Sequence, residues 1–243
     1  MEQQQQQQQI AVVFDFDETL TVRHLHYLIE GKGPLHLTHI DKARFPYTRR
    51  EELLERREFV VEWVFGGEER VSALRELLQA LSHHADLIIS SNGQLPRILA
   101  ALKQVGLETF FRYINARGRL ENVVWDRDTG RQLSGSGSKE NFIAEFVGPH
   151  YAKCVLFIDN EMLPRYGIKL HGKKYHLLNM RPEQKGMDEE DFARLRAAVE
   201  ECAHHHYLTL SNCYCETCGK QGAELCDTRC SVMYCSEACY LRK

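Results

Sequence analysis

Short apolar runs alternate with amphipathic stretches along most of the chain, and this pattern predicts the fold class. Apolar runs with the length of a buried strand occupy residues 10–14, 87–89, 110–114, 154–158 and 175–178. Helices are expected over residues 68–81, 95–105, 139–146 and 188–202. Strands that alternate with helices predict an α/β fold with a Rossmann-like, doubly wound parallel sheet that has helices on both faces.

Two segments depart from this alternation. Residues from about 23 to 67 interrupt it and have helical character over 49–63, so we expect a small helical insertion over the ligand crevice. Its histidines are expected to be scattered surface residues rather than ligands; they are His24, His26, His36 and His39. Residues 1–9 include seven consecutive glutamines and are expected to form a disordered polar tail.

Length and composition limit the class of protein. The 243 residues are 43% hydrophobic, which suffices for one sizeable domain, expected over 10–206, and a smaller segment over 213–243. A net charge of −3 argues against general binding to nucleic acid or to a membrane surface. No apolar run approaches the roughly 20 residues that cross a bilayer, and the N-terminus does not resemble a secretory signal. We therefore expect an intracellular protein, cytoplasmic or nuclear.

Polar residues stand at the carboxyl ends of three predicted strands. Asp15 and Asp17 follow the first strand, Ser91 and Asn92 follow the second, and Asp159 follows the fourth. Ligands of doubly wound sheets bind beyond these strand ends. The three clusters are therefore expected to meet in one crevice.

The spacing of Asp15 and Asp17 suits phosphoryl transfer, because residues i and i+2 of an extended chain point the same way. Asp15 would attack phosphorus and form an aspartyl-phosphate, while Asp17 would protonate the leaving group and then activate water. Close carboxylates repel a phosphate dianion, so cations are needed. Lys139 is the expected catalytic cation, and Mg²⁺ would bind Asp15, Asp17 and Asp159. Ser91 would hydrogen-bond the phosphoryl oxygens.

Together these motifs resemble the haloacid-dehalogenase-like (HAD) phosphatase superfamily over residues 10 to about 200. Residues 14–21, Phe-Asp-Phe-Asp-Glu-Thr-Leu-Thr, are similar to its first motif, and Ile-Ser-Ser-Asn-Gly at 89–93 is similar to its second. Lys139 matches the third motif, and Phe-Ile-Asp-Asn-Glu at 157–161 is similar to the fourth. The resemblance implies a Rossmann-like core, Mg²⁺ and hydrolysis of phosphomonoesters.

The resemblance also implies roles for single residues. It places Ser91 in the phosphate-binding position, with Asn92 beside it, and implies that Thr19 supports the turn and helps to position Asp17. The chain departs from the family pattern at Asn160, where a second acid is common; Glu161 could substitute, although an extended backbone would point it elsewhere. Lys153 competes with Lys139, which is favoured because a Gly/Ser loop precedes it.

Nine cysteines are unevenly placed. Cys154 and Cys202 stand alone in the sequence, and the other seven fall in the last 31 residues. Paired spacings in this tail are typical of zinc–thiolate sites, and bound metal would supply the folding energy of so short a segment. The paired residues are Cys215 with Cys218, Cys226 with Cys230, and Cys235 with Cys239.

This tail resembles a MYND-type zinc finger, especially in the Cys-Gly-Lys at 218–220 and the Tyr-Cys-Ser at 234–236. The resemblance implies two Zn²⁺ ions and binding of short peptide motifs of protein partners. One ion would be held by Cys215, Cys218, Cys235 and Cys239. The second site begins with Cys226 and Cys230 but lacks two ligands before the chain stops at Lys243. The finger is truncated or degenerate, or Cys213 and a histidine of 204–206 complete it.

The sequence thus predicts a Mg²⁺-dependent phosphomonoester hydrolase with a zinc-binding tail that recruits a protein partner. Its substrate would be a phosphorylated molecule of undefined size. The alternative is a catalytically weak or inactive HAD-like scaffold whose zinc finger recruits partners; Asn160 and the incomplete zinc pattern favour it. Nucleic-acid binding is not expected, since the tail lacks a dense basic stripe.

Overall fold

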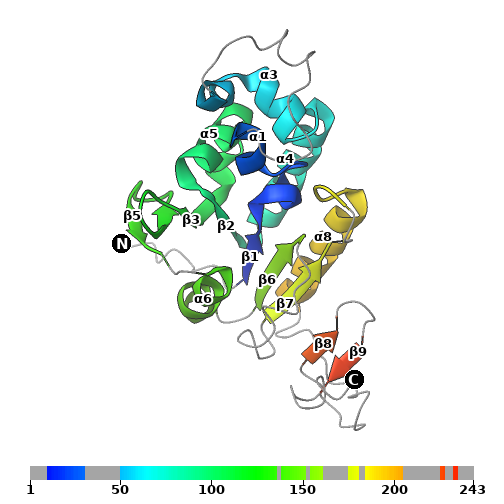
Figure 1. The fold of residues 1–243 in the computed structure, drawn as a ribbon. Helices are drawn as coiled ribbons and strands as arrows, with labels where there is room; N and C mark the ends of the chain where they lie inside the picture. The colour runs from blue at the N-terminus through cyan, green and yellow to red at the C-terminus, as the bar shows by residue number, and fades with distance from the viewer. Residues whose placement is uncertain are drawn as a thin grey trace, which may run out of the picture.

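The structure is a computed structural model that describes residues 10–30, 50–135, 138–151, 154–160, 175–180, 184–204, 225–227 and 232–234. Seven strands form one sheet in the order β5-β4-β3-β2-β1-β6-β7 (Figure 1). They are β1 (Ile10–Phe14), β2 (Asp86–Gln94), β3 (Phe111–Arg117), β4 (Asn122–Asp126), β5 (Gln132–Ser134), β6 (Cys154–Asp159) and β7 (Tyr175–Asn179).

Five consecutive strands, from β3 to the edge strand β7, are parallel and confirm the predicted sheet. β1 pairs with β2 on one side and with β6 on the other, β3 extends the sheet beyond β2, and β7 extends it beyond β6. The antiparallel strands β4 and β5 were not expected. Phe14 lies level with Ile89 and Ile158, so β1 and β6 end together beside Asp15, while β2 continues to Gln94.

Helical segments occupy the predicted stretches and the insertion. The longer ones are α1 (Leu25–Glu30), α4 (Glu68–Ser82), α5 (Leu95–Val105) and α8 (Glu189–His204). Shorter segments are η1 (Phe16–Leu20), η2 (Arg50–Glu55), α3 (Arg57–Phe59), η3 (Val60–Val64), η4 (Glu108–Phe110), α6 (Lys139–Asn141), η5 (Phe142–Val147) and α7 (Gly148–His150). Helix α5 ends as predicted because Gly106 takes the left-handed conformation, with φ 63°, that closes many helices.

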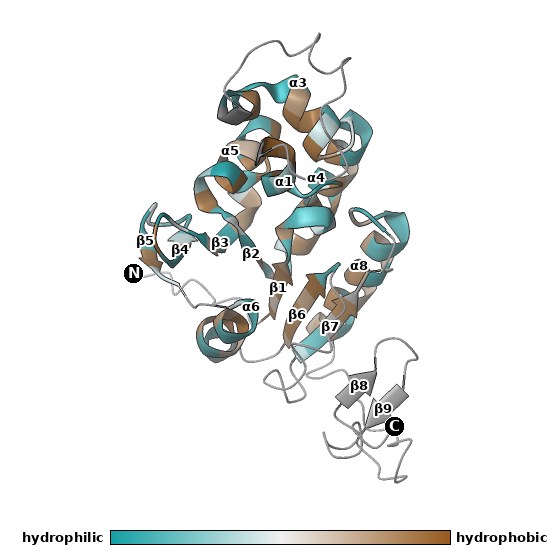
Figure 2. Ribbon diagram, in the orientation of Figure 1, coloured by the Kyte–Doolittle hydropathy of each residue, from teal (hydrophilic) through white to brown (hydrophobic). Residues whose placement is uncertain are grey.

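Alternation along β1 assigns its residues to two cores. Ile10, Val12 and Phe14 belong to a large core with residues of α4, α5 and α8, while Ala11 and Val13 belong to a smaller one with residues of η5. Both faces of the sheet are therefore covered, and the apolar strands lie between helices whose outer sides are hydrophilic (Figure 2). The prediction of a doubly wound α/β sheet is confirmed.

The described parts of the insertion, residues 23–30 and 50–67, pack into the large core. Leu28 of α1, Leu53 of η2 and Phe59 of α3 are each no more than 5% exposed. These helices extend the same apolar core that α5 forms on the sheet. His36 and His39 lie outside the described residues.

Two short antiparallel strands are described in the tail, β8 (Leu225–Asp227) and β9 (Val232–Tyr234). The remaining tail and the glutamine run 1–9 lie outside the described residues, as do six predicted zinc-finger cysteines. These are Cys213, Cys215, Cys218, Cys230, Cys235 and Cys239. The zinc finger and its partner therefore stay predictions. Within the part of the chain that is described, no helix combines the length and apolarity needed to cross a bilayer.

Candidate active site

The backbone after β1 presents Asp15 and Asp17 at the strand end. The Asp15 N–H still donates to the Ile158 carbonyl (2.8 Å), so the sheet pairing continues to this residue. Asp17 is extended, with φ −70° and ψ 126°, and Glu18 then turns the chain with a left-handed φ of 57°. The charge of Asp17 contributes to the raised pKa of Asp15, so the two carboxyl groups lie near each other.

Lys139 joins Asp15 to Asp159. Lys139 is the first residue of α6. The side chain of Ser138 caps this helix by accepting a hydrogen bond from the Asn141 N–H. The helix lies on the face of the sheet to which the Asp15 side chain points. Its Nζ lies 2.7 Å from Asp15 Oδ1 and 2.9 Å from Asp159 Oδ2. All three residues are at most 5% exposed. The competing Lys153 lies outside the described residues.

Thr19 connects the turn to the end of β6. Its Oγ1 lies 3.5 Å from Asp15 Oδ2 and accepts a hydrogen bond from the Asn160 N–H (3.2 Å). Asn160 Oδ1 also lies 3.5 Å from this hydroxyl, so Asn160 faces the site. The resemblance implied that Thr19 helps to position Asp17; its side-chain contacts are to Asp15 and Asn160, and the Leu25 N–H donates to Asp17 Oδ1 (2.6 Å). Glu161 lies outside the described residues.

Ser91 and Asp17 meet around Gly93. The Gly93 N–H donates to Ser91 Oγ (3.0 Å). A Cβ added at Gly93 would lie 3.2 Å from Ser91 Oγ and 3.4 Å from Asp17 Oδ2. The glycine therefore keeps open a space between the hydroxyl and the carboxylate. Asn92, between Ser91 and Gly93 in the sequence, is exposed.

Burial dominates the electrostatics of the site. Burial, helped by the charges of Asp159 and Asp17 and opposed by the Lys139 ammonium, raises the pKa of Asp15 to about 7. Burial also raises the pKa of Asp17, which the His24 ring and the Leu25 N–H lower in part. Burial opposes the charge of Lys139, but the carboxylates of Asp15 and Asp159 outweigh this effect and raise its pKa.

The donor set fits a hard divalent cation. The Lys139 ammonium contacts the carboxyl groups of Asp15 and Asp159, and Asp17 adds a third carboxyl whose charge acts on Asp15. The ionised site therefore carries excess negative charge in a buried position. Carboxylate oxygens are the ligands that Mg²⁺ prefers, and a bound cation would favour their ionised forms. The three predicted Mg²⁺ ligands are therefore compatible with the site.

Two residues that the sequence reasoning missed support the turn after β1. His24, expected on the surface, is half-buried with Nδ1 3.8 Å from Asp17 Oδ1 and its ring stacked on Tyr27. The Arg70 guanidinium donates to the carbonyls of Leu20 (2.8 Å), Phe65 (3.0 Å), Met187 (3.2 Å) and Thr19 (3.4 Å). Arg70 of α4 thus ties the turn to two other segments.

No family model matches the chain, and no curated protein matches it. Among solved structures, the chain is similar to the HAD domain of effector protein Lem4 from Legionella pneumophila, at 15% identity and a TM-score of 0.49, over 80% of this chain and 96% of that one. It is also similar to a haloacid-dehalogenase-like family hydrolase from Xanthomonas campestris, at 17% identity and a TM-score of 0.36, over 82% and 98% of the two chains. A HAD-superfamily hydrolase from Ehrlichia chaffeensis has 15% identity and a TM-score of 0.38, over 79% and 96%.

Proposed function

We propose that this chain is a Mg²⁺-dependent phosphomonoester hydrolase that acts through an aspartyl-phosphate on Asp15. The observation that carries the proposal is the buried ammonium of Lys139, which contacts both Asp15 and Asp159 at the end of β1. Asp17, two residues after Asp15, supplies the second carboxyl that complete turnover needs. The resemblance of the sequence motifs to the HAD superfamily supports the same reaction.

The reaction has two halves: Asp17 donates a proton in the first and takes one up in the second. In the first, an Asp15 carboxylate oxygen bonds to phosphorus, the bond to the leaving oxygen breaks, and Asp17 gives that oxygen its proton. In the second, water attacks the aspartyl-phosphate, Asp17 takes a proton from it, and the bond to Asp15 breaks to release inorganic phosphate. The raised pKa of Asp17 suits a group that must be protonated in one half and ionised in the other.

The remaining residues bind and orient the phosphoryl group. Lys139 holds Asp15 in place and offers positive charge where the phosphoryl oxygens gain negative charge. The Ser91 hydroxyl and the space at Gly93 suit a phosphoryl oxygen near Asp17. Mg²⁺ would be held by the carboxylates of Asp15 and Asp159 and by Asp17 through its main-chain oxygen, which leaves the Asp17 carboxyl free to carry the proton. When bound, it would supply further positive charge to the phosphate.

The test compares wild type with Asp15→Asn and Asp17→Asn on a panel of phosphoesters, with Mg²⁺ or with a chelator. The panel contains an aryl phosphate, a sugar phosphate, a nucleoside monophosphate and a phosphopeptide. We expect phosphate release to need Mg²⁺ and to fall at least roughly a thousandfold in Asp15→Asn. With the aryl phosphate, whose leaving group needs little protonation, Asp17→Asn should accumulate phosphate on Asp15, detected by mass spectrometry after an acid quench. Phosphate release that is unchanged in Asp15→Asn would overturn the proposal.

The stability of Asp15→Asn provides the control. The pKa of Asp15 predicts whether the variant is more or less stable than wild type. A carboxyl whose pKa rises to about 7 on folding favours the folded state below its unfolded pKa, and this contribution is lost as the pH rises through about 7. Without Mg²⁺, the variant should therefore be at least as stable to urea as wild type at about pH 8, with a difference that shrinks toward about pH 4. Lost turnover then cannot be ascribed to unfolding.

A further inference from the structure

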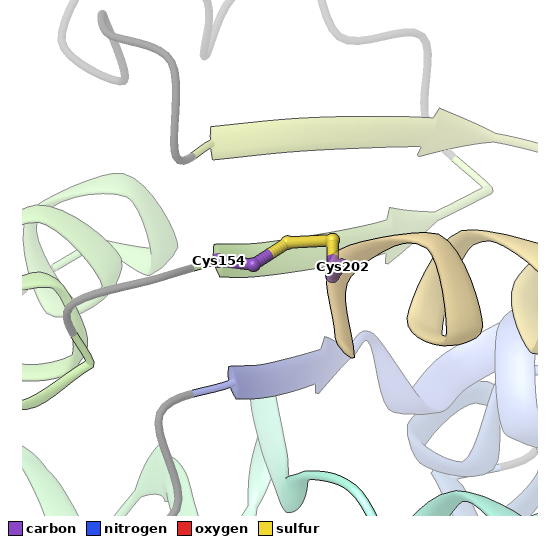
Figure 3. Close-up of a disulfide and its surroundings, with 2 residues drawn as sticks. All are labelled: Cys154 and Cys202. Carbon is purple, nitrogen blue, oxygen red and sulfur yellow. A yellow bond between two sulfur atoms is a disulfide. The ribbon is translucent and has the colours of Figure 1, made fainter. Parts of the chain in front are cut away.

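Two cysteines and a histidine meet at the opposite end of the sheet from Asp15. Cys154 is the first residue of β6, His176 lies in β7, and Cys202 lies in the last turn of α8. The two sulfur atoms and a ring nitrogen of His176 all lie within 4.8 Å of one another. The structure joins the sulfurs as a disulfide, with the two Cα atoms 6.2 Å apart (Figure 3). Residues that stand 48 positions apart in the sequence are thus neighbours.

Regular structure, rather than a loop, holds this cluster in place. His176 pairs with Leu156 across β6 and β7, and Leu156 lies two residues after Cys154 on the same face of the sheet. Helix α8 covers this face through Leu195 and Val199, which belong to the same core as Cys154 and Cys202. Sheet register and helix packing therefore direct three potential ligands to one point.

We propose that the reduced pair Cys154 and Cys202, together with His176, forms a Zn²⁺ site. Thiolate sulfur and imidazole nitrogen are the donors that zinc prefers in proteins. Both cysteines are 2% exposed, which shields the sulfurs, while His176 is only partly buried. Three protein ligands leave the fourth tetrahedral position to water or to a further ligand.

The disulfide and the metal site are alternative states of the same two sulfurs. Conversion of the disulfide to the dithiol takes two electrons and two protons, and zinc binding then displaces the thiol protons. In the experiment a phosphine reductant supplies the electrons and water supplies the protons. A Cα separation of 6.2 Å suits the disulfide.

This site is independent of the proposed phosphatase reaction. Cys154 and Asp159 occupy opposite ends of β6, which at the usual rise per residue places them about 16 Å apart. The site is also separate from the predicted zinc finger, whose cysteines all follow residue 212. It therefore predicts one Zn²⁺ ion beyond those of the tail.

The test measures Zn²⁺ retained by the full chain after reduction, loading and removal of loose metal with a weak chelator. Because the tail also contains cysteines, the difference between variants is the readout. We expect the double variant Cys154→Ser, Cys202→Ser to retain one Zn²⁺ ion fewer than wild type. His176→Gln keeps both sulfurs and should weaken binding of that one ion about tenfold or more. The exposed His84 provides a matched control in His84→Gln, which should retain the wild-type number.

Co²⁺ in place of Zn²⁺ gives a second readout, because sulfur-to-cobalt charge-transfer absorption reports thiolate ligands. The double variant should lose part of this absorption, and His176→Gln should change its ligand-field bands while its circular dichroism stays that of wild type. Equal Zn²⁺ retention and equal Co²⁺ spectra in wild type and His176→Gln would overturn the proposal and leave the pair as a disulfide. This test does not depend on the folding of the double variant, because the comparison of wild type with His176→Gln alone decides whether the zinc site exists.

Discussion

The two ends of strand β6 present different donor atoms. At its carboxyl end, Asp159 lies with Asp15 around the Lys139 ammonium, an environment of hard oxygen ligands. At its amino end, Cys154 lies with Cys202 and His176, an environment of sulfur and nitrogen. Hard donors favour Mg²⁺ and soft donors favour Zn²⁺, so one strand can frame two sites that do not compete for the same ion.

The two ends also differ in how their side chains are held. The sulfur and imidazole groups belong to residues of regular elements, and sheet register and helix packing position them. Asp17 instead lies in a turn that contains the left-handed residue Glu18. That turn depends on added hydrogen bonds, from the Gly186 N–H to the Glu18 carbonyl and from Arg70 to Thr19 and Leu20. Variants at the two ends should therefore have separable effects.

Lys139→Met should have the largest effect at one end of β6 with none at the other. Methionine keeps most of the side-chain volume but removes the charge that contacts Asp15 and Asp159. We expect phosphate release to fall roughly a hundredfold to a thousandfold, because the developing charge on the phosphoryl group loses a fixed cation. Zn²⁺ retention at the other end of β6 should match wild type. Steady-state kinetics and metal analysis on one preparation check both.

The reciprocal variant is His176→Gln. It should lose Zn²⁺ affinity while its phosphate release stays within about twofold of wild type, since His176 lies at the far end of the sheet. A large loss of turnover in this variant, or loss of Zn²⁺ in Lys139→Met, would show that the two ends of β6 are coupled and do not act independently.

Arg70→Met should have the next largest effect, on stability. Four carbonyl groups from three segments lose a charged donor, and we expect the free energy of unfolding to fall by about 3 kcal/mol. Burial lowers the pKa of Arg70 to about 10, so the donor is charged at neutral pH. Urea denaturation measures the change.

Arg75 on the same helix provides the matched control. Its side chain is exposed and donates to a single carbonyl, that of Val105. Arg75→Met should therefore change the unfolding free energy by less than about 1 kcal/mol. Equal losses in the two variants would mean that the turn after β1 does not depend on Arg70 in particular.

Much of the oxygen-rich end could be predicted because its residues follow apolar runs. Asp15 and Asp159 stand where buried strands end, and parallel strands end together. The sulfur-rich end could not be predicted, because it depends on the register of β6 with β7 and on how α8 lies across them. Neither property leaves a local pattern in the sequence. The same is true of β5, whose residues are all exposed and show no periodicity of buried positions.

His24 was missed for a different reason. It reaches Asp17 only because Glu18, a residue that rarely adopts a positive φ, reverses the chain between them. Turn signals in a sequence come chiefly from Gly, Asn and Pro, and none stands at this position. No local pattern marks Arg70 within its predicted helix, because its carbonyl partners come from segments far apart in the sequence.

His24→Phe should have the smallest effect, and it tests the fine electrostatics of the oxygen-rich end. Phenylalanine keeps a ring to stack on Tyr27 but removes the nitrogen near Asp17 Oδ1. Because the His24 ring lowers the pKa of Asp17, its removal should raise that pKa. Nuclear magnetic resonance titration of the Asp17 carboxyl, without Mg²⁺, measures the shift directly. His84→Phe, an exposed histidine just before β2, should leave this pKa unchanged. A fall in the Asp17 pKa in His24→Phe would contradict a stabilising interaction between the His24 ring and the ionised carboxyl.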